Sequence, residues 1–154
     1  MKKLHTYIDE LASFIPDLEK RNEGISASSV GWQIEHSLLT IRIVSGGLLA
    51  SDPSSFSPSF TFKKLLILIT GKMPRGKAKA PKIVMPDAFT QESLSKHIDK
   101  AKETLEHLQQ AQANQFVSHP YFGHINKKET IRFLAIHTLH HLKIIREIVA
   151  AEKA

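Results

Sequence analysis

The chain has 154 residues, carries a formal net charge of +6 and contains no cysteine. The absence of cysteine excludes disulfides, thiolate metal sites, iron–sulfur clusters and a cysteine nucleophile, so any metal would need imidazole, carboxylate or carbonyl ligands. Much of the positive charge lies in residues 72–82, which makes it a property of one loop and weakens the case for a nucleic-acid-binding face. The length fits a single domain over residues 1–154.

Two helices are predicted in the first third of the chain. Residues 3–21 place apolar side chains at helical spacing, although Pro16 should kink or split this helix. Ser29 is positioned as the N-cap of a second helix over residues 30–50. His36 lies at the centre of the apolar stripe of that second helix.

Three further segments complete the predicted architecture. Residues 60–70 are apolar and are interpreted as a helix, because nothing else in the chain alternates like a strand that could pair with them. A helix over residues 90–114 follows, and a last helix over residues 126–151 begins with a capping box of Asn126 and Glu129. Four long helices predict an all-α fold of the four-helix-bundle type.

The apolar runs of the sequence indicate where in the cell the protein is expected. No apolar core of a signal peptide follows Met1. The longest dense apolar run, residues 65–69, is far too short to span a bilayer. We therefore expect a cytoplasmic protein without a membrane partner.

The last helix carries two histidines that point to a metal site. His137 and His141 are four residues apart, so their side chains stack on one face, in the middle of the apolar stripe. A metal ion would satisfy both buried imidazoles, and His36 is the natural third ligand from another helix. Three neutral imidazoles leave coordination positions open, as catalytic sites do. The alternative is that these histidines are ordinary hydrogen-bonded core residues.

Several neighbouring side chains are candidates for supporting such a site. Trp32 shares the stripe of His36, and Glu35 is a general base, an exposed carboxylate or a carboxylate that supports the ligands. His140 lies at the flank of its stripe, beside the ligands or at the surface. His119 and Tyr121 either reach the site from the turn before the last helix or simply shape that turn.

The positive loop resembles a phosphate-binding loop without completing one. Residues 71–78 read Gly-Lys-Met-Pro-Arg-Gly-Lys-Ala, and Ala78 stands where a magnesium-binding Ser or Thr is needed. A nucleotide role is therefore not expected. The loop is either a solvated segment or a gate that attracts an anionic substrate to the metal site. The positive side chains concerned are Lys72, Arg75, Lys77, Lys79 and Lys82.

Three segments together resemble the DinB-like (YfiT-like) superfamily, and in particular one uncharacterised branch of it. Residues 31–37 (Gly-Trp-Gln-Ile-Glu-His-Ser) resemble its W-x-x-x-H segment. Residues 119–123 (His-Pro-Tyr-Phe-Gly) and 137–142 (His-Thr-Leu-His-His-Leu) resemble its HPxFG and HxxHH ending. The 73–82 loop also looks like that branch. These segments occur in the same order as in that superfamily, and the resemblance covers most of the chain.

The resemblance implies a fold, a metal site and a class of function. It implies an up-down-down-up four-helix bundle, often a homodimer, with a nickel, zinc, iron or manganese ion held by His36, His137 and His141. A metal-dependent hydrolase or a thiol-dependent transferase is then expected, acting on a small anionic or thiol substrate. A non-catalytic metal-binding or stress-related protein is the alternative. A nucleic-acid-binding module that uses loop 72–82 is less expected.

Overall fold

The chain is mostly helical, with one small sheet. The computed structural model describes residues 1–76 and 80–151. Within these residues it contains five α-helices and one antiparallel sheet of two strands. The elements in chain order are α1 (Lys2–Ser13), α2 (Val30–Leu49), α3 (Phe62–Thr70), α4 (Gln91–Gln110), β1 (Phe116–His119), β2 (Gly123–Asn126) and α5 (Lys127–Ala151).

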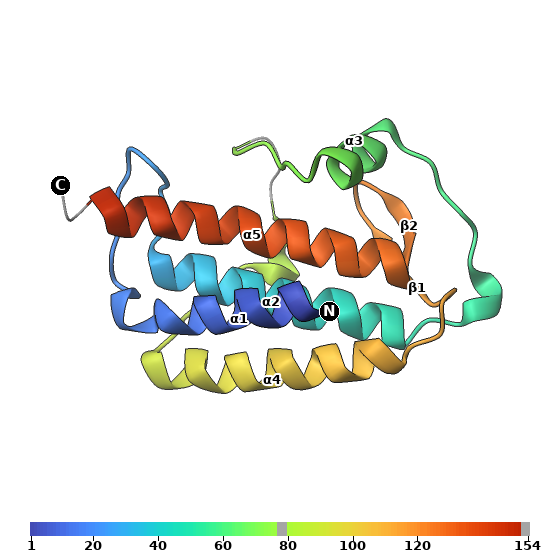
Figure 1. Ribbon diagram of the computed structural model, residues 1–154, viewed down its shortest axis with the longest axis horizontal. Coiled ribbons are helices and arrows are strands. Elements are labelled where there is room, and N and C mark those ends of the chain that lie inside the picture. Colours follow the sequence, from blue (N-terminus) through green and yellow to red (C-terminus); the bar gives the residue numbers. More distant parts are fainter. Residues whose placement is uncertain (77–79, 152–154) are drawn as a thin grey trace.

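Four long helices enclose the core. Helix α2 packs against α4 and α5, and α1 packs against the same two helices from the other side. Figure 1 shows that α1 and α5 run in one direction along the long axis, whereas α2 and α4 run in the other. Apolar side chains from all four helices fill the space between them; examples that are fully buried are Leu4, Ile34, Leu38, Leu105, Leu134 and Ile145.

Two helix starts are formed by the side chains that the sequence indicated. The hydroxyl oxygen of Ser29 accepts the backbone N–H of Trp32 at 3.3 Å and so caps α2. At the start of α5, Asn126 and Glu129 each accept the backbone N–H of the other, at 3.0 and 3.1 Å. Because these caps fix where each helix begins, they also fix which face each histidine occupies.

The structure refines two expectations from the sequence. Pro16 splits the first predicted helix, as expected: α1 ends at Ser13 and a short 3₁₀ helix over Ile15–Asp17 follows, because Pro16 lacks a backbone N–H and disfavours helical geometry in the residue before it. The chain is also not purely α-helical, because residues 116–126 form a hairpin in which Val117 lies opposite Ile125. Strands of only four residues are too short to show a convincing alternation in the sequence.

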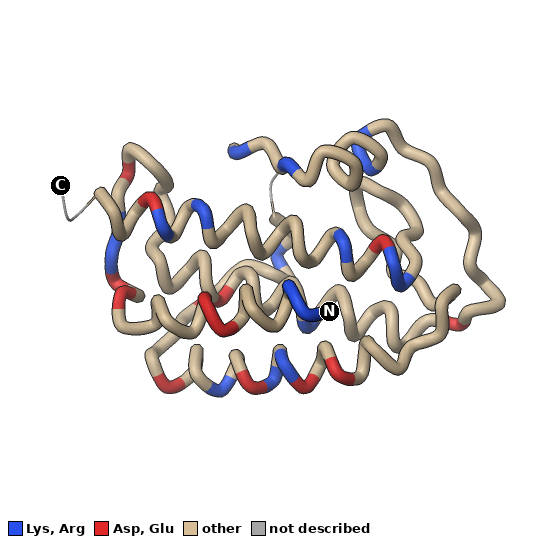
Figure 2. Tube along the Cα trace, viewed as in Figure 1, with Lys and Arg blue, Asp and Glu red and all other residues tan. Residues whose placement is uncertain are grey.

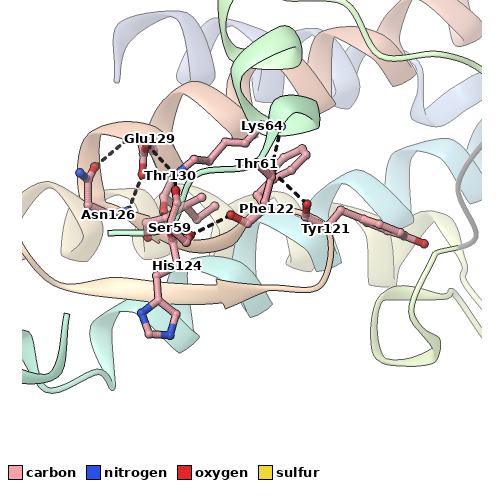
Figure 3. Close-up of polar contacts among 10 residues, drawn as sticks. Ser59, Thr61, Lys64, Tyr121, Phe122, His124, Asn126, Glu129 and Thr130 are labelled. Carbon is pink, nitrogen blue, oxygen red and sulfur yellow. Dashed lines mark hydrogen bonds and ion pairs between the residues drawn. The ribbon is translucent and has the colours of Figure 1, made fainter. Parts of the chain in front are cut away.

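The segment before α3 is attached to the hairpin and to α5 by polar contacts, which Figure 3 shows. The Ser59 hydroxyl lies 3.0 Å from the carbonyl oxygens of both Phe122 and His124. The Lys64 ammonium is 3.2 Å from a carboxylate oxygen of Glu129 and also donates to the Ser59 carbonyl. These contacts position α3 on the outer side of α5, beside the hairpin (Figure 1). No described helix combines the length and apolarity that crossing a lipid bilayer requires.

Candidate metal centre

Three buried histidines meet between α2 and α5. His36 comes from the middle of α2, and His137 and His141 come from successive turns of α5; their exposed fractions are 4 %, 7 % and 8 %. Their candidate ligand nitrogens all lie within 4.8 Å of one another. The ring centroids are 4.5 to 5.1 Å apart. The predicted proximity of these three imidazoles is therefore confirmed, and together they could hold a metal ion.

Two of the three rings are oriented by a carbonyl oxygen behind them. The Nδ1 atom of His36 is 2.7 Å from the carbonyl oxygen of Val84, and Nδ1 of His141 is 2.6 Å from the side-chain oxygen of Gln33. A carbonyl oxygen only accepts hydrogen bonds, so each Nδ1 carries the proton and donates it. The Nε2 atom of each ring is then unprotonated, with its lone pair free to bind a cation. Metal-binding histidines are commonly held in this way.

The third ring, His137, is only partly satisfied by the protein. Its Nε2 lies 3.3 Å from Nε2 of His141, and its buried Nδ1 has no hydrogen-bond partner in the described structure. Leaving such a buried polar atom unpaired costs about 1–3 kcal/mol. Two nitrogens bound to one tetrahedral zinc ion at 2.0–2.1 Å are themselves about 3.3 Å apart. The spacing of this pair therefore fits two neighbouring ligands of one ion.

Burial keeps the cluster uncharged near neutral pH. Burial lowers the pKa of His36 and lowers the pKa of His137 and His141 well below the ordinary value of 6.5, and the neighbouring imidazoles add to the effect for His137 and His141. Imidazole binds metals in its neutral form, so lowered pKa values favour binding. Three neutral nitrogen ligands suit zinc, nickel and iron, and leave coordination positions for water or a substrate.

Aromatic rings enclose the cluster. The Trp32 ring is stacked on His36 with centroids 4.8 Å apart, and the His140 ring meets His141 edge-on at 5.1 Å. Phe133 lies 5.7 Å from His137. Both Trp32 and His140 thus lie directly beside the candidate ligands. They can restrict the motion of the rings and the access of water.

Glu35 is buried, with an exposed fraction of 4 %, which excludes the exposed position among those expected for it. Both of its carboxylate oxygens are 2.8 Å from Nδ1 of His97, a residue of α4. Its described contacts therefore join α2 to α4, and they do not support a role as general base at the three histidines. No pattern in the sequence singles out His97, because a pairing between separate helices is not encoded in local spacing.

The turn before α5 approaches the cluster through one aromatic ring. His119 is stacked on Phe122 at 4.2 Å and meets Phe133 edge-on at 4.7 Å, and Phe133 in turn contacts His137. Burial lowers the pKa of His119 to about 4. Its Nδ1 accepts the backbone N–H of Tyr121 at 3.2 Å, which shapes the hairpin turn. The Tyr121 side chain is 42 % exposed.

The segment directly after the positive loop contributes to the centre through its backbone. The carbonyl that orients His36 belongs to Val84, in a short turn over Lys82–Val84. Arg75 forms two hydrogen bonds of 2.7 Å with Glu147 of α5 and lowers the pKa of His140, together with burial and Lys143. Lys72 and Lys82 are exposed, and Lys77 and Lys79 lie outside the described residues.

Two residues that orient the rings were missed by sequence reasoning. Gln33 precedes His36 by one helical turn, so its shared face was a signal that could have found it. No signal in the sequence indicated the Val84 carbonyl, because every residue has a backbone carbonyl and this contact joins residues 48 positions apart.

Comparison with known proteins identifies a family without an assigned function. No curated protein and no solved structure is detectably similar to the chain. Residues 33–148 match the family described as "Protein of unknown function (DUF1569)". The matched segment contains all three clustered histidines and also Gln33 and Val84. Since it spans well over half of the sequence, the chain belongs to the DUF1569 family.

Proposed function

We propose that the protein is a metal-dependent enzyme whose divalent transition metal ion is held by His36, His137 and His141. The observation that carries the proposal is the orientation of the rings. Carbonyl oxygens hold the protons of His36 and His141 at Nδ1, and Nε2 of His141 lies 3.3 Å from Nε2 of His137. Together with His36, these rings place three candidate ligand nitrogens within 4.8 Å of one another.

The chemistry follows from the open coordination positions. A bound zinc, nickel, iron or manganese ion would lower the pKa of a water molecule or a substrate thiol toward neutrality. Hydrolysis and thiol-dependent group transfer are the two reaction classes that such an ion supports. These four candidate metals come from the resemblance, and the three-nitrogen ligand set suits manganese least.

The protein groups around the ion have separate roles in this proposal. Val84 and Gln33 keep two imidazoles in the required protonation state. Trp32 covers one face of His36 and limits the access of bulk water. The charge of Arg75 is paired with Glu147, whereas Lys143 supplies positive charge close to His140, at the side of the centre. This charge suits a small substrate that carries a negative group or a thiolate.

We also propose a topology for the helical bundle and an oligomeric state for the protein. The opposite directions of α1 and α5 relative to α2 and α4 support an up-down-down-up four-helix bundle of the DinB-like kind (Figure 1). Membership of that superfamily, a homodimer and a cytoplasmic location follow from the sequence resemblance and composition. Sedimentation of the purified chain tests the homodimer directly.

A second candidate function is metal binding without catalysis. It is favoured by the burial of the three rings, which are 4–8 % exposed. Two cavities that the structure describes, of about 370 and 350 Å³, lie at α3 and have no histidine in their walls. A metal centre with little space for a substrate would store or buffer the ion, or stabilise the fold.

Metal analysis distinguishes these proposals from an ordinary histidine core. The full chain, purified without an affinity tag, is compared with His137→Ala and with His107→Ala, an exposed histidine of α4 that serves as the control. We expect near-stoichiometric metal in the parent and in the control, and loss of metal in His137→Ala. Equal metal content in all three proteins would refute both metal-based proposals. Screening with small thiols and esters then separates the enzyme from the non-catalytic protein.

A further inference from the structure

Helix α3 turns four of its apolar side chains outward and a lysine inward, while Ile67 and Leu68 pack against the core. Lys64 is 8 % exposed, whereas Phe62 is 71 % and Ile69 67 % exposed. Lysine is almost never buried without a partner, and large apolar side chains gathered on a surface commonly mark a binding site. We call the exposed residues of this segment the α3 apolar face; they are Phe60, Phe62, Leu65, Leu66 and Ile69.

Specific polar contacts fix α3 in this orientation. The Lys64 ammonium lies against the Glu129 carboxylate and the Ser59 carbonyl, as Figure 3 shows. The Thr61 hydroxyl caps the helix by accepting the backbone N–H of Lys64 at 3.1 Å. Rotating α3 to bury its apolar side chains would break the ion pair and leave Glu129 without its cation. The exposure of the apolar face is therefore built into the fold.

The surroundings of the α3 apolar face are positively charged. Lys63 lies within the helix and Lys72 follows its end, and both are exposed. Lys128 and Arg132 of α5 are exposed beside it, and Figure 2 shows the positive residues of α3 and of the adjoining start of α5. The acidic residue in this region, Glu129, is already paired with Lys64.

A cavity of about 370 Å³ joins the two kinds of surface. One wall is apolar and comes from α3, and the other comes from α5 and its N-cap. The residues that line it are Leu68, Ile69, Asn126, Lys128, Glu129 and Arg132. Cationic groups opposite apolar ones suit a ligand with an anionic head and an apolar chain. Anionic phospholipids have this chemistry.

We propose that α3 docks on the surface of an anionic phospholipid bilayer. The α3 apolar face would enter the boundary between headgroups and acyl chains, and Lys63, Lys128 and Arg132 would bind lipid phosphates. A second copy of the chain fits this face less well, because a two-fold contact would bring the same cations together. The proposal departs from the sequence-based expectation of no membrane partner, and it is independent of the metal centre.

Vesicle co-sedimentation of the full chain tests the proposal. The vesicles contain either phosphatidylcholine alone or an equal mixture of phosphatidylcholine and phosphatidylglycerol. We expect binding to the anionic vesicles only, weakened by added salt. Arg132→Gln should reduce the partition coefficient about five-fold, since one surface cation is lost. Ile69→Ser should reduce it roughly ten-fold, since an inserted apolar side chain is lost.

Ile83→Ser is the matched control, because Ile83 is 68 % exposed but lies outside α3. It should bind anionic vesicles as the parent does, and circular dichroism should show that all variants keep the parental helix content. No binding to anionic vesicles would overturn the proposal. Equal losses for Ile69→Ser and Ile83→Ser would also overturn it. So would a dimer, seen by sedimentation, that Ile69→Ser alone dissociates, because the face would then be covered by a second copy.

Discussion

The histidine cluster and the α3 apolar face depart from the usual distribution of residues in opposite directions. Three imidazoles lie in the core between α2 and α5, whereas large apolar side chains lie on the surface of α3. In the core, two carbonyl oxygens accept hydrogen bonds from Nδ1 of His36 and of His141. The candidate ligand nitrogens of the three rings lie within 4.8 Å of one another. On α3, an ion pair between the buried Lys64 and the half-buried Glu129 holds the helix with its apolar side outward. Each departure is thus stabilised by named contacts, which makes it testable.

The largest expected effect is the pH dependence of the metal-free protein. Folding lowers the pKa of the three clustered histidines, so below pH 6.5 the unfolded chain binds more protons than the folded chain. The free energy of unfolding should therefore fall as the pH drops from 7 to 5, by at most about 2 kcal/mol for each ring. Urea denaturation in the presence of a chelator measures this loss.

The matched variant His137→Leu sharpens that test. Removing one of the three titrating rings should reduce the loss by about 1–2 kcal/mol. An unfolding free energy that stays constant from pH 7 to 5 would mean that the rings are not held neutral by burial.

The ion pair between the buried Lys64 and the half-buried Glu129 should give the next largest effect. Lys64→Met leaves the Glu129 carboxylate without its cation and should lower the free energy of unfolding by about 2 kcal/mol. Lys63→Met is the control, because the neighbouring Lys63 is exposed and should change stability by less than about 0.5 kcal/mol. Equal effects of the two substitutions in urea denaturation would contradict the inward orientation of Lys64.

The contact between α2 and α4 should give a smaller effect. Glu35→Gln keeps the size of the side chain but weakens its hydrogen bonds with His97. We expect a loss of about 1 kcal/mol in the free energy of unfolding and no change in metal content. Loss of metal in this variant, with the fold intact by circular dichroism, would instead link Glu35 to the centre.

The smallest expected effect concerns the positive loop. Arg75 and Glu147 are both largely exposed, so Arg75→Gln should change the free energy of unfolding by less than about 0.5 kcal/mol. Metal content should also stay at the parental level, because His36 is oriented by the Val84 backbone and not by Arg75. A thermal unfolding curve and a metal assay of the variant check both statements. A clear loss of metal would show that the loop must be anchored for the centre to form.

The sequence predicted the parts of the fold and of the site that depend on local periodicity. The spacing of His137 and His141, the central position of His36 and the caps at Ser29 and Asn126 are all helical patterns, and the structure confirms them. The hairpin was missed because its strands are short. The Val84 carbonyl, the His97 partner and the inward side of α3 depend on contacts between distant segments, which local patterns do not encode.

X-ray absorption at the zinc edge of the zinc-loaded full chain is the most direct measurement. We predict three imidazole nitrogens at about 2.0–2.1 Å from the ion in the parent, and two in His36→Ala. Fewer than three imidazoles in the parent, or a spectrum that His36→Ala leaves unchanged, would contradict the assignment of the three histidines as ligands of one ion.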